Sequence, residues 1–452
     1  MSDRFRVLVG DRIAPDELAP LGEDPRFELL VHPAPKPDEL RSLVADVDAL
    51  IVRSATKVTR EVIEAAGRLR IIGRAGVGVD TIDVGAATER GIAVVNAPAG
   101  NTLSAAELAF ALLLSLARRV PAADRSMKEG EWSRAKFNGI ELHGKTLGLV
   151  GVGRIGGEVA SRARAFGMRV VAYDPFLTEE RAQGLGVTML PLDELLEQAD
   201  ALSLHVPLTE STAGMIGAAQ LARMRRGALL VNAARGGVVD ESALADAVGS
   251  GHLGGAALDV FAEEPLPVEH PLRHVEGVVL TPHLGASTRE AQRNVAAEIA
   301  EAVRDALLHG DLSRAVNAPA VSGERMRALR PLLELGERLG RLATALHRGA
   351  VEEAEITYSG DAEGVLRPLA ASTLVGVLTD VVGPQGVNFV NALHLAGTRG
   401  IRVVERRRET EGRAAEVTLV LEGGGRRVRV TGQLVAPDRA RLIAIDDYRV
   451  DL

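Results

Sequence analysis

Three apolar runs between residues 227 and 285 each end in side chains that could take part in catalysis. The runs GALLVNAARGG, GAALDVFAEEP and GVVLTPHLG carry, in order, Arg235, then Asp259 and Glu264, then His283. Imidazole is the usual general base near neutral pH, and a carboxylate beside it orients the ring and stabilises its protonated form. A guanidinium binds a carboxylate in bidentate fashion and polarises a developing carbonyl. The three groups together fit proton removal from a 2-hydroxy acid.

Each of these residues also has an ordinary structural interpretation. His283 could be a loop histidine after Thr281-Pro282, and Glu263 or Glu269 could be the carboxylate in place of Glu264. The functional interpretation is favoured because the three runs are typical of parallel strands. The carboxyl ends of such strands form the ligand-binding crevice of an open α/β sheet.

Oxidation of an alcohol also requires an acceptor for the hydride that leaves carbon. A glycine pattern upstream of the three runs predicts a binding site for such a cofactor. Residues 147–156 read LGLVGVGRIG, with Gly151, Gly153 and Gly156 in G-x-G-x-x-G spacing. Because 48 of the 452 residues are glycine, this spacing alone is weak. Its setting is specific, since a helical pattern begins at the last glycine and the next strand pattern, MRVVAYD, ends at Asp174.

This βαβ unit predicts a dinucleotide site. The amide groups at the helix N-terminus would bind the pyrophosphate. Asp174 would accept hydrogen bonds from the ribose hydroxyls and repel a 2′-phosphate, so NAD is predicted rather than NADP. The ordinary alternative is that Asp174 is a turn residue before Pro175.

The elements that position these residues suggest an α/β protein with an inserted domain. Five Val/Ile/Leu runs before residue 98, separated by helical patterns, predict a parallel sheet covered on both faces. Two long helices, 101–120 and about 288–309, bracket a second set of strand–helix units, with Asn101, Thr102 or Ser104 as N-cap candidates. We therefore expect a Rossmann-type NAD-binding domain inserted in a flavodoxin-like substrate-binding domain. The expected bounds are 99–286 for the NAD-binding domain, and 1–98 with 287–316 for the substrate-binding domain.

Residues 317–452 predict a third domain of α+β type. Helical patterns over 324–347 and 367–382 precede alternating strand patterns, with a hairpin turn at Gly423–Gly425. Several arginines fall in this region, and the simplest interpretation is charged strand faces and turns. The alternative is an anion site that senses the phosphate of the substrate. These arginines are Arg406, Arg407, Arg408, Arg426, Arg427, Arg429, Arg439 and Arg441.

Composition limits the classes of partner. The formal charge of −8 argues against nucleic acid or an anionic membrane as the main partner, and no apolar stretch predicts a membrane span. The absence of cysteine excludes thiolate metal sites and cysteine nucleophiles, and we expect no metal. The first ten residues show no signal segment, so a cytoplasmic location is expected.

The sequence resembles the D-isomer-specific 2-hydroxyacid dehydrogenase family, in particular its long phosphoglycerate dehydrogenase branch. The resemblance implies NAD-dependent oxidation of D-3-phosphoglycerate to 3-phosphohydroxypyruvate, the entry to serine synthesis, and it implies that the third domain is the intervening domain of the long forms. Long forms usually continue into a small ACT domain, which we expect this chain to lack because it ends at Leu452. The matching segments are VRSATKVT (52–59), GRAGVGVD (73–80), NAPAGNTLSAAE (96–107), KFNGIELHGKTLGLVGVGRIG (136–156), NAARGGVVDE (232–241), ALDVFAEEP (257–265) and TPHLGAST (281–288).

The resemblance also implies site residues beyond those derived above. It assigns the roles already described to Arg235, Glu264 and His283. Arg53 and Arg74 each follow a strand pattern, and two such cations suit a phosphate plus a carboxylate, although surface salt bridges are the ordinary alternative. The implied substrate contacts are Arg53, Ser54, Arg74 and Gly76, with Arg134 as a further candidate. The implied cofactor contacts are Arg154, Ile155, Asp174, Ala233, Asp259, Gly285 and Ala286, beside the three fingerprint glycines.

Other functions and assemblies stay open at this stage. A glyoxylate or hydroxypyruvate reductase, or another D-2-hydroxyacid dehydrogenase, is the alternative enzyme, and an NAD-sensing interaction protein is the alternative of another class. Arg53, Arg74 and the third domain favour a phosphorylated substrate. The strongly apolar helix 101–120 predicts a homodimer interface, with a homotetramer as the alternative.

Overall fold

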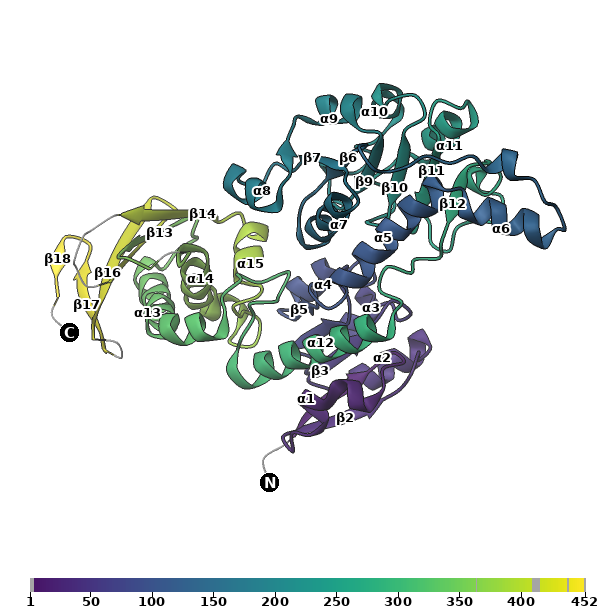
Figure 1. Cartoon of the computed structure of the whole chain (residues 1–452). Coiled ribbons are helices and arrows are strands. Elements are labelled where there is room, and N and C mark those ends of the chain that lie inside the picture. The colour runs from purple at the N-terminus through teal and green to yellow at the C-terminus, as the bar shows by residue number, and fades with distance from the viewer. Residues whose placement is uncertain (1–3, 363, 409–414, 437–438, 451–452) are drawn as a thin grey trace. The chain divides into compact units, whose positions relative to one another are not determined.

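The computed structural model describes residues 4–362, 364–408, 415–436 and 439–450. It contains two compact units, Met1–Ala97 with Val295–Leu452, and Pro98–Asn294 (Figure 1). The second unit is inserted in the sequence of the first, between β5 (Ala93–Asn96) and most of α12 (Arg289–His309).

The N-terminal sheet is a five-stranded parallel sheet in the order β2-β1-β3-β4-β5, which is the flavodoxin-like order. All five predicted strands are confirmed. Neighbouring side chains alternate between two cores, because Val7 and Val9 pack under α12 whereas Leu8 packs under the helices on the other face. The other strands are β1 (Phe5–Val9), β2 (Phe27–Val31), β3 (Ala49–Val52) and β4 (Ile71–Arg74), and the helices of that other face are α2 (Pro37–Val44), α3 (Arg60–Ala65) and α4 (Val84–Glu89).

The second unit contains a seven-stranded parallel sheet in the order β12-β11-β10-β9-β6-β7-β8. Its helices α5 and α7 pack on one face, and α9, α10 and α11 pack on the other, as Figure 1 shows. The strand order reverses between β6 and β9, where an open sheet of this kind binds ligands. The strands are β6 (Thr146–Val150), β7 (Arg169–Tyr173), β8 (Thr188–Met189), β9 (Ala201–Leu204), β10 (Leu229–Asn232), β11 (Gly255–Leu258) and β12 (Val278–Leu280). The helices are α5 (Thr102–Ala117), α7 (Arg154–Ala165), α9 (Leu192–Gln198), α10 (Ala218–Arg223) and α11 (Glu241–Gly249).

The predicted helix 101–120 is confirmed over most of its length, but it ends three residues earlier than predicted. The helix α5 ends at Ala117, Arg119 adopts a left-handed φ of 51°, and a separate helix α6 (Val120–Lys128) follows. Pro121 explains the break, because a proline inside a continuing helix removes an amide donor and its ring clashes with the carbonyl four residues earlier. At the start of α6 the same proline is well tolerated.

The N-cap prediction for α5 is also only partly right. Asn101 occupies the N-cap position, but its side chain makes no capping hydrogen bond. Within the described residues, Asn101 Oδ1, Thr102 Oγ1 and Ser104 Oγ are all buried without a hydrogen-bond partner.

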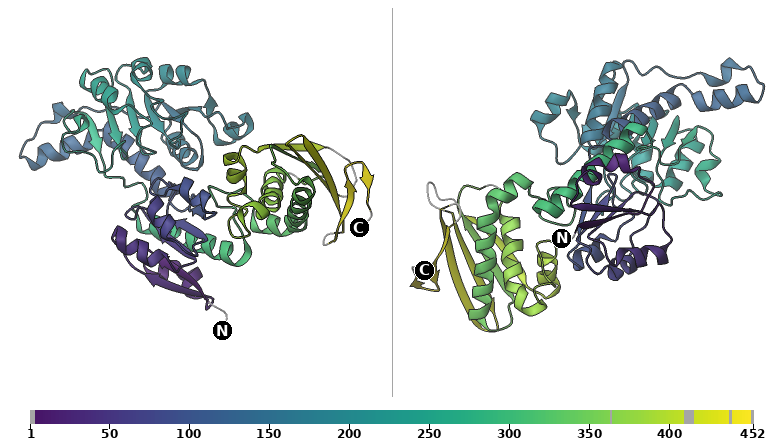
Figure 2. Two further views of the ribbon diagram at one scale, coloured as in Figure 1. Left: turned by 180° about the vertical axis from the view of Figure 1, so that it is seen from behind. Right: turned by 90° about the horizontal axis from the view of Figure 1, so that it is seen from below.

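The third domain is a six-stranded sheet in the order β14-β13-β15-β16-β17-β18, covered on one face by α13 (Gly323–His347) and α14 (Leu366–Val382). Figure 2 shows both helices on the same side of the sheet. The sequence did not predict β13 (Glu353–Ser359) and β14 (Arg402–Arg408), which pair in parallel. The remaining strands are antiparallel: β15 (Glu416–Gly423), β16 (Arg426–Ala436), β17 (Arg439–Ile445) and β18 (Tyr448–Arg449).

The predicted hairpin turn is confirmed. Gly423 pairs with Arg426, and the two residues between them, Gly424 and Gly425, have φ values of 56° and 73°. A two-residue turn with both φ values positive continues the twist of the paired strands, and glycine adopts it without strain.

Over the described parts of the chain, none of the helices has the length and apolarity that crossing a bilayer requires. The same residues form no group of three or more histidine or acidic side chains placed to hold a metal ion.

Candidate active site

The three fingerprint glycines each have a separate structural reason. Gly151 has a φ of 90°, and a Cβ atom there would lie 2.6 Å from the carbonyl oxygen of His205. A Cβ atom on Gly156 would lie 2.2 Å from the carbonyl oxygen of Gly151, so helix and loop pack too closely for a side chain. A Cβ atom on Gly153 would meet nothing within 4 Å. The open space at Gly153 is where a dinucleotide pyrophosphate can approach the backbone.

The helix α7 begins directly after this loop. Its N-cap is Gly153, which has no side chain to cap the first amide groups, and Arg154 is exposed while Ile155 is half-buried. Uncapped amides and the positive end of the helix dipole favour an anion at this position.

Asp174 follows β7 directly and faces the glycine loop. Its Oδ2 accepts a hydrogen bond from the amide of Val152 at 2.9 Å, and its Oδ1 accepts one from the amide of Phe176, also at 2.9 Å. A carboxylate oxygen can accept more than one hydrogen bond, so capacity for ribose hydroxyls remains. Asp174 therefore fixes the loop and keeps the capacity to accept further hydrogen bonds.

The structure brings Glu264 and His283 into direct contact. His283 Nδ1 lies 2.8 Å from Glu264 Oε2, and Glu264 Oε1 accepts a hydrogen bond from the amide of Phe261 at 3.1 Å. The side chains of His283 and Glu264 are 48% and 37% exposed, so both are accessible to a ligand. With Nδ1 engaged by Glu264, Nε2 is the nitrogen available to exchange a proton with a substrate.

Asp259 anchors the turn that carries His283. Its carboxylate is fully buried and accepts hydrogen bonds from Thr281 Oγ1 at 2.6 Å, from the amide of Leu284 at 2.7 Å and from the amide of Gly285 at 2.9 Å. Burial raises the pKa of the Asp259 carboxyl, and these hydrogen bonds oppose the rise. His283 itself has a left-handed φ of 55°, which a non-glycine residue adopts only when its surroundings hold it there.

Arg235 lies in a turn that Asn232 holds. The side chain of Asn232, the last residue of β10, accepts the amide of Ala234 at 3.1 Å and donates to the carbonyl of Arg235 at 3.0 Å. A Cβ atom on Gly236 would lie 1.8 Å from the carbonyl oxygen of Phe261. The turn of Arg235 thus packs directly on the loop that carries Glu264, and both follow neighbouring strands.

Two of these supporting residues escaped the sequence analysis, Asn232 and Thr281. Asn232 is the single polar residue of the buried strand LLVN, and Thr281 follows the last residue of β12 by one position. A polar residue at or just after the end of an otherwise apolar strand is the sequence signal that could have identified both residues.

The predicted substrate residues of the first unit lie at the carboxyl end of its sheet. Arg53 and Ser54 follow Val52, which pairs with Arg74 on the neighbouring strand. The amide of Arg53 donates to Asp11 Oδ2 at 2.6 Å, which fixes the loop after β3. The two guanidinium-bearing residues therefore belong to adjacent strand ends of one sheet.

Arg134 is placed differently. It lies in the exposed 3-10 turn Arg134–Phe137, beside Trp132, whose side chain is largely exposed. No hydrogen bond or ion pair within the described residues links Arg134 to Arg235, Glu264 or His283.

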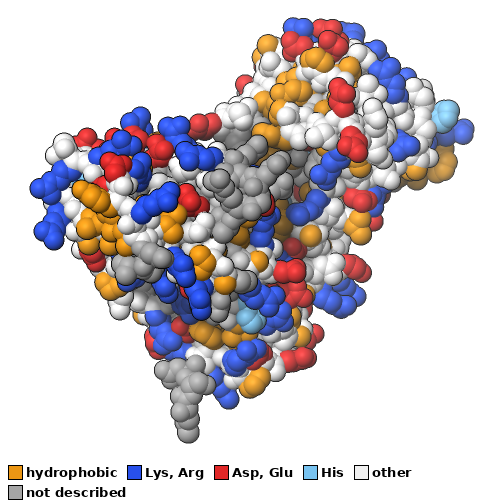
Figure 3. All heavy atoms as spheres, turned by 90° about the vertical axis from the view of Figure 1, so that its left-hand side faces the viewer, with side chains coloured by type: hydrophobic (Ala, Val, Ile, Leu, Met, Phe, Trp, Pro, Cys, Tyr) orange, Lys and Arg blue, Asp and Glu red, His pale blue; other side chains and the backbone are white. Residues whose placement is uncertain are grey.

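Three of the arginines predicted to lie on strand faces of the third domain form ion pairs with acidic residues. On the open face of its sheet, Arg406 pairs with Glu355, Arg427 with Glu422 and Arg429 with Asp447. Figure 3 shows basic and acidic side chains close together on the side to which this sheet faces. These pairs support the interpretation as charged strand faces.

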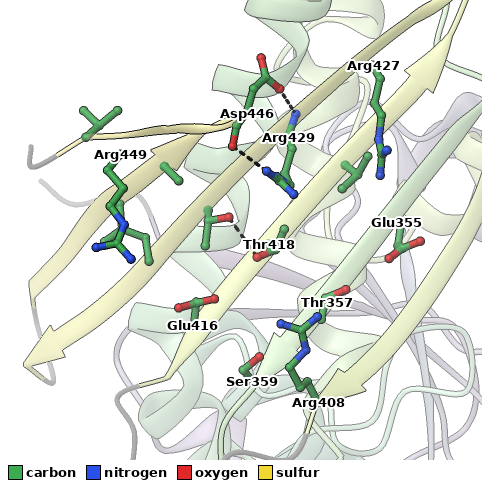
Figure 4. Close-up of a pocket in the computed structure, with 15 residues that line it drawn as sticks. Glu355, Thr357, Ser359, Arg408, Glu416, Thr418, Arg427, Arg429, Asp446 and Arg449 are labelled. Atoms are coloured by element: carbon green, nitrogen blue, oxygen red, sulfur yellow. Dashed lines mark hydrogen bonds between the residues drawn. The ribbon is translucent and has the colours of Figure 1, made fainter.

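A cavity of about 790 Å³ lies on this open face (Figure 4). Arg408 and Arg449 line it together with Glu416 and the paired residues Arg429 and Asp446. Its lining is thus of mixed charge.

Comparison with known proteins gives the family. Residues 110–285 match the family described as "D-isomer specific 2-hydroxyacid dehydrogenase, NAD binding domain", and residues 328–446 match the "D-3-phosphoglycerate dehydrogenase intervening domain". The D-3-phosphoglycerate dehydrogenase of Synechocystis sp. is 45% identical over 418 residues, which cover 92% of this chain and 75% of that protein. The enzyme of the same name from Archaeoglobus fulgidus is 42% identical over 448 residues, covering 99% of this chain and 85% of that protein. Among solved structures, the TT0316 protein from Thermus thermophilus has a TM-score of 0.63 and 40% sequence identity over 69% of this chain and 100% of that one.

Fold and site together define an NAD-dependent dehydrogenase of the D-isomer-specific 2-hydroxyacid class. The glycine loop is held by Asp174, and a histidine–carboxylate pair and an arginine follow neighbouring strands of the same sheet. The intervening domain narrows the class further, and the chain belongs to the D-3-phosphoglycerate dehydrogenase family. The resemblance predicted from the sequence is confirmed.

Proposed function

We propose that this chain oxidises D-3-phosphoglycerate to 3-phosphohydroxypyruvate, the first step of L-serine biosynthesis, with His283 as the general base. The contact between His283 Nδ1 and Glu264 Oε2 carries the mechanistic part of this proposal. Similarity to D-3-phosphoglycerate dehydrogenases over 92% and 99% of this chain supports the choice of substrate.

The residues around the glycine loop fit NAD. The open space at Gly153 accommodates a pyrophosphate, and the Asp174 carboxylate suits a ribose with two free hydroxyls. We assign Gly151, Gly153, Arg154, Ile155, Gly156 and Asp174 to the dinucleotide, and Ala233, Asp259, Gly285 and Ala286 to the nicotinamide end. When bound, NAD supplies the ring that accepts the hydride from C2 of the substrate.

The side chains of the chain supply the rest of the chemistry. His283 Nε2 takes the proton of the C2 hydroxyl as the C2–H bond breaks. Glu264 orients the ring through Nδ1 and stabilises the imidazolium that forms. Arg235 binds the substrate carboxylate and polarises the oxygen that becomes the carbonyl.

His283, Glu264 and Arg235 serve the reacting end of the substrate, so other cations must bind its phosphate. We assign Arg53, Ser54, Arg74 and Gly76 to substrate binding, with Arg134 as a further contact. Support comes from the adjacent strand ends that present Arg53 and Arg74. A doubly charged phosphate binds well to two guanidinium groups.

We further propose three domains with the bounds predicted above and a homodimer as the smallest assembly. The helices α5 and α6 and the segment after them carry large exposed apolar side chains, Leu103, Val120, Met127 and Trp132. Large apolar side chains left exposed on a folded domain favour association. Trp132→Glu should shift the molar mass measured by light scattering from that of a dimer to that of a monomer. A tetrameric wild type would show that a second interface exists. A monomeric wild type would contradict the proposal.

A substrate panel tests the function. Purified protein is assayed for NADH formation with D-3-phosphoglycerate, glycerate, D-lactate and D-2-hydroxyglutarate at equal concentrations. We expect the highest kcat/KM with D-3-phosphoglycerate. Good turnover of an unphosphorylated acid without turnover of phosphoglycerate would contradict the proposal.

A further inference from the structure

The carboxylate of Glu241 joins two points of the loop that carries Glu264. Glu241 is the first residue of α11, and its Oε1 accepts a hydrogen bond from the amide of Ala262 at 2.7 Å. Its Oε2 lies 3.1 Å from His270 Nε2, near the far end of the same loop. The side chains of Glu241 and His270 are only 10% and 20% exposed. This carboxylate is therefore a largely buried bridge and not a surface ion pair.

The hydrogen bonds of His270 indicate how the bridge is protonated. His270 Nδ1 accepts a hydrogen bond from the amide of Leu272 at 3.4 Å. In the neutral ring the proton therefore lies on Nε2, which donates to Glu241 Oε2. The start of α11 also favours a negative charge on Glu241 through the helix dipole. A neutral ring in this tautomer can therefore complete the bridge to Glu241.

The bridge holds the segment Phe261–Glu264, which positions Glu264 against His283. Ala262 follows Phe261, whose amide donates to Glu264 Oε1. The carbonyl of Phe261 packs against Gly236, next to Arg235. A shift of this segment would move Glu264 relative to His283.

We propose that Glu241, braced by His270, is a positioning residue that holds the Phe261–Glu264 segment so that Glu264 meets His283. The inference rests on the proposed function of Glu264 as the partner of the base. Glu241 has its hydrogen bonds with the loop and with His270, so its effect on the reaction passes through the position of Glu264.

The test compares Glu241→Ala, Glu241→Gln and Glu264→Gln, alone and combined, in the full chain. Glu241→Ala should lower kcat with D-3-phosphoglycerate about 10- to 100-fold, because small displacements of catalytic groups cost rates of this order. The Kd for NAD should change less than about twofold. Glu241→Gln keeps an acceptor for the Ala262 amide and should restore kcat to within about threefold of the wild type. The matched control is Glu269→Ala, an exposed carboxylate of the same loop, which should leave kcat unchanged.

The double variant of Glu241 and Glu264 distinguishes a positioning role of Glu241 from a general effect on stability. On the Glu264→Gln background, Glu241→Ala should cause little further loss, because both changes disturb one interaction. Losses that multiply would contradict the inference, as would a wild-type kcat in folded Glu241→Ala, or parallel falls in kcat and NAD affinity. If Glu241→Ala does not fold, His270→Ala takes its place in the test. Its kcat should be about threefold lower than that of the wild type, and this loss should vanish on the Glu264→Gln background. A kcat equal to that of the wild type would then contradict the inference. Full kcat in Glu264→Gln alone would contradict the proposed function instead.

Discussion

The guanidinium of Arg74 occupies the space that any side chain at position 76 would need. A Cβ atom on Gly76 would lie 1.2 Å from Arg74 Nη1, and Gly76 has a φ of 156°. Gly76 therefore determines where the cation can lie, in addition to the backbone contact with substrate that the resemblance implies.

Gly76→Ala should therefore behave like a loss of Arg74. Displacement of the guanidinium removes a charged hydrogen bond to the phosphate, and KM for D-3-phosphoglycerate should rise about tenfold or more with a smaller change in kcat. Steady-state kinetics of Gly76→Ala, Arg74→Ala and the double variant check this, and the rise in KM of the double variant should be smaller than the product of the two single effects. Gly397→Ala serves as the control, because a Cβ atom there meets nothing within 4 Å. An unchanged KM in Gly76→Ala would show that Arg74 does not bind substrate from this position.

Asp174 should set the preference for NAD over NADP. Asp174→Ala removes the charge that repels a 2′-phosphate and the acceptor that holds the Val152 amide, so affinity for NAD should fall while NADP gains relative to it. The ratio of kcat/KM for NAD to that for NADP should fall by about tenfold or more. If the wild-type enzyme already prefers NADP, the role assigned to Asp174 is wrong.

His205 should make the NAD-binding unit sensitive to acid. Burial lowers the pKa of His205 from 6.5 to about 4, and the carbonyl of the same residue packs against Gly151. An unfolded chain takes up this proton at higher pH than the folded chain, so stability should be lost progressively as the pH falls from about 6.5 to about 4. The loss should be roughly 2 kcal/mol, below the full linkage value because the residue is still partly accessible.

The measurement is the free energy of unfolding as a function of pH, by denaturant titration. His205→Asn should flatten the curve between these pH values, whereas His274→Asn, an exposed histidine of the same unit, should leave it unchanged. A pH dependence that is identical in wild type and His205→Asn would contradict this assignment.

The elements that could be predicted from the sequence are those whose pattern is local. Runs such as ALIV and LRIIG are apolar on both faces, which is typical of a covered parallel strand, and they became β3 and β4. The glycine loop was predictable because helix, loop and strand are consecutive in the chain. Glu264 was chosen over Glu263 and Glu269 by resemblance, and the structure places Glu264 on His283.

What escaped prediction depends on contacts between distant residues. The strand β14 reads RVVERRR, which carries no clear alternation, so its parallel pairing with β13 could not be foreseen. Glu241 looks like an ordinary acidic residue in the first turn of a helix, and only its contacts with Ala262 and His270 give it a role. The close approach of the Arg74 guanidinium to Gly76 likewise depends on the conformation of the Arg74 side chain, which the sequence pattern does not show.

The measurement that tests the central claim most directly is NADH formation from D-3-phosphoglycerate by His283→Ala, with NAD affinity measured on the same preparation. A general base contributes about 10²- to 10⁴-fold, so kcat should fall by this factor while the Kd for NAD stays within about twofold of the wild type. A kcat close to that of the wild type, or equal losses of turnover and NAD binding, would contradict the assignment of His283 as the base.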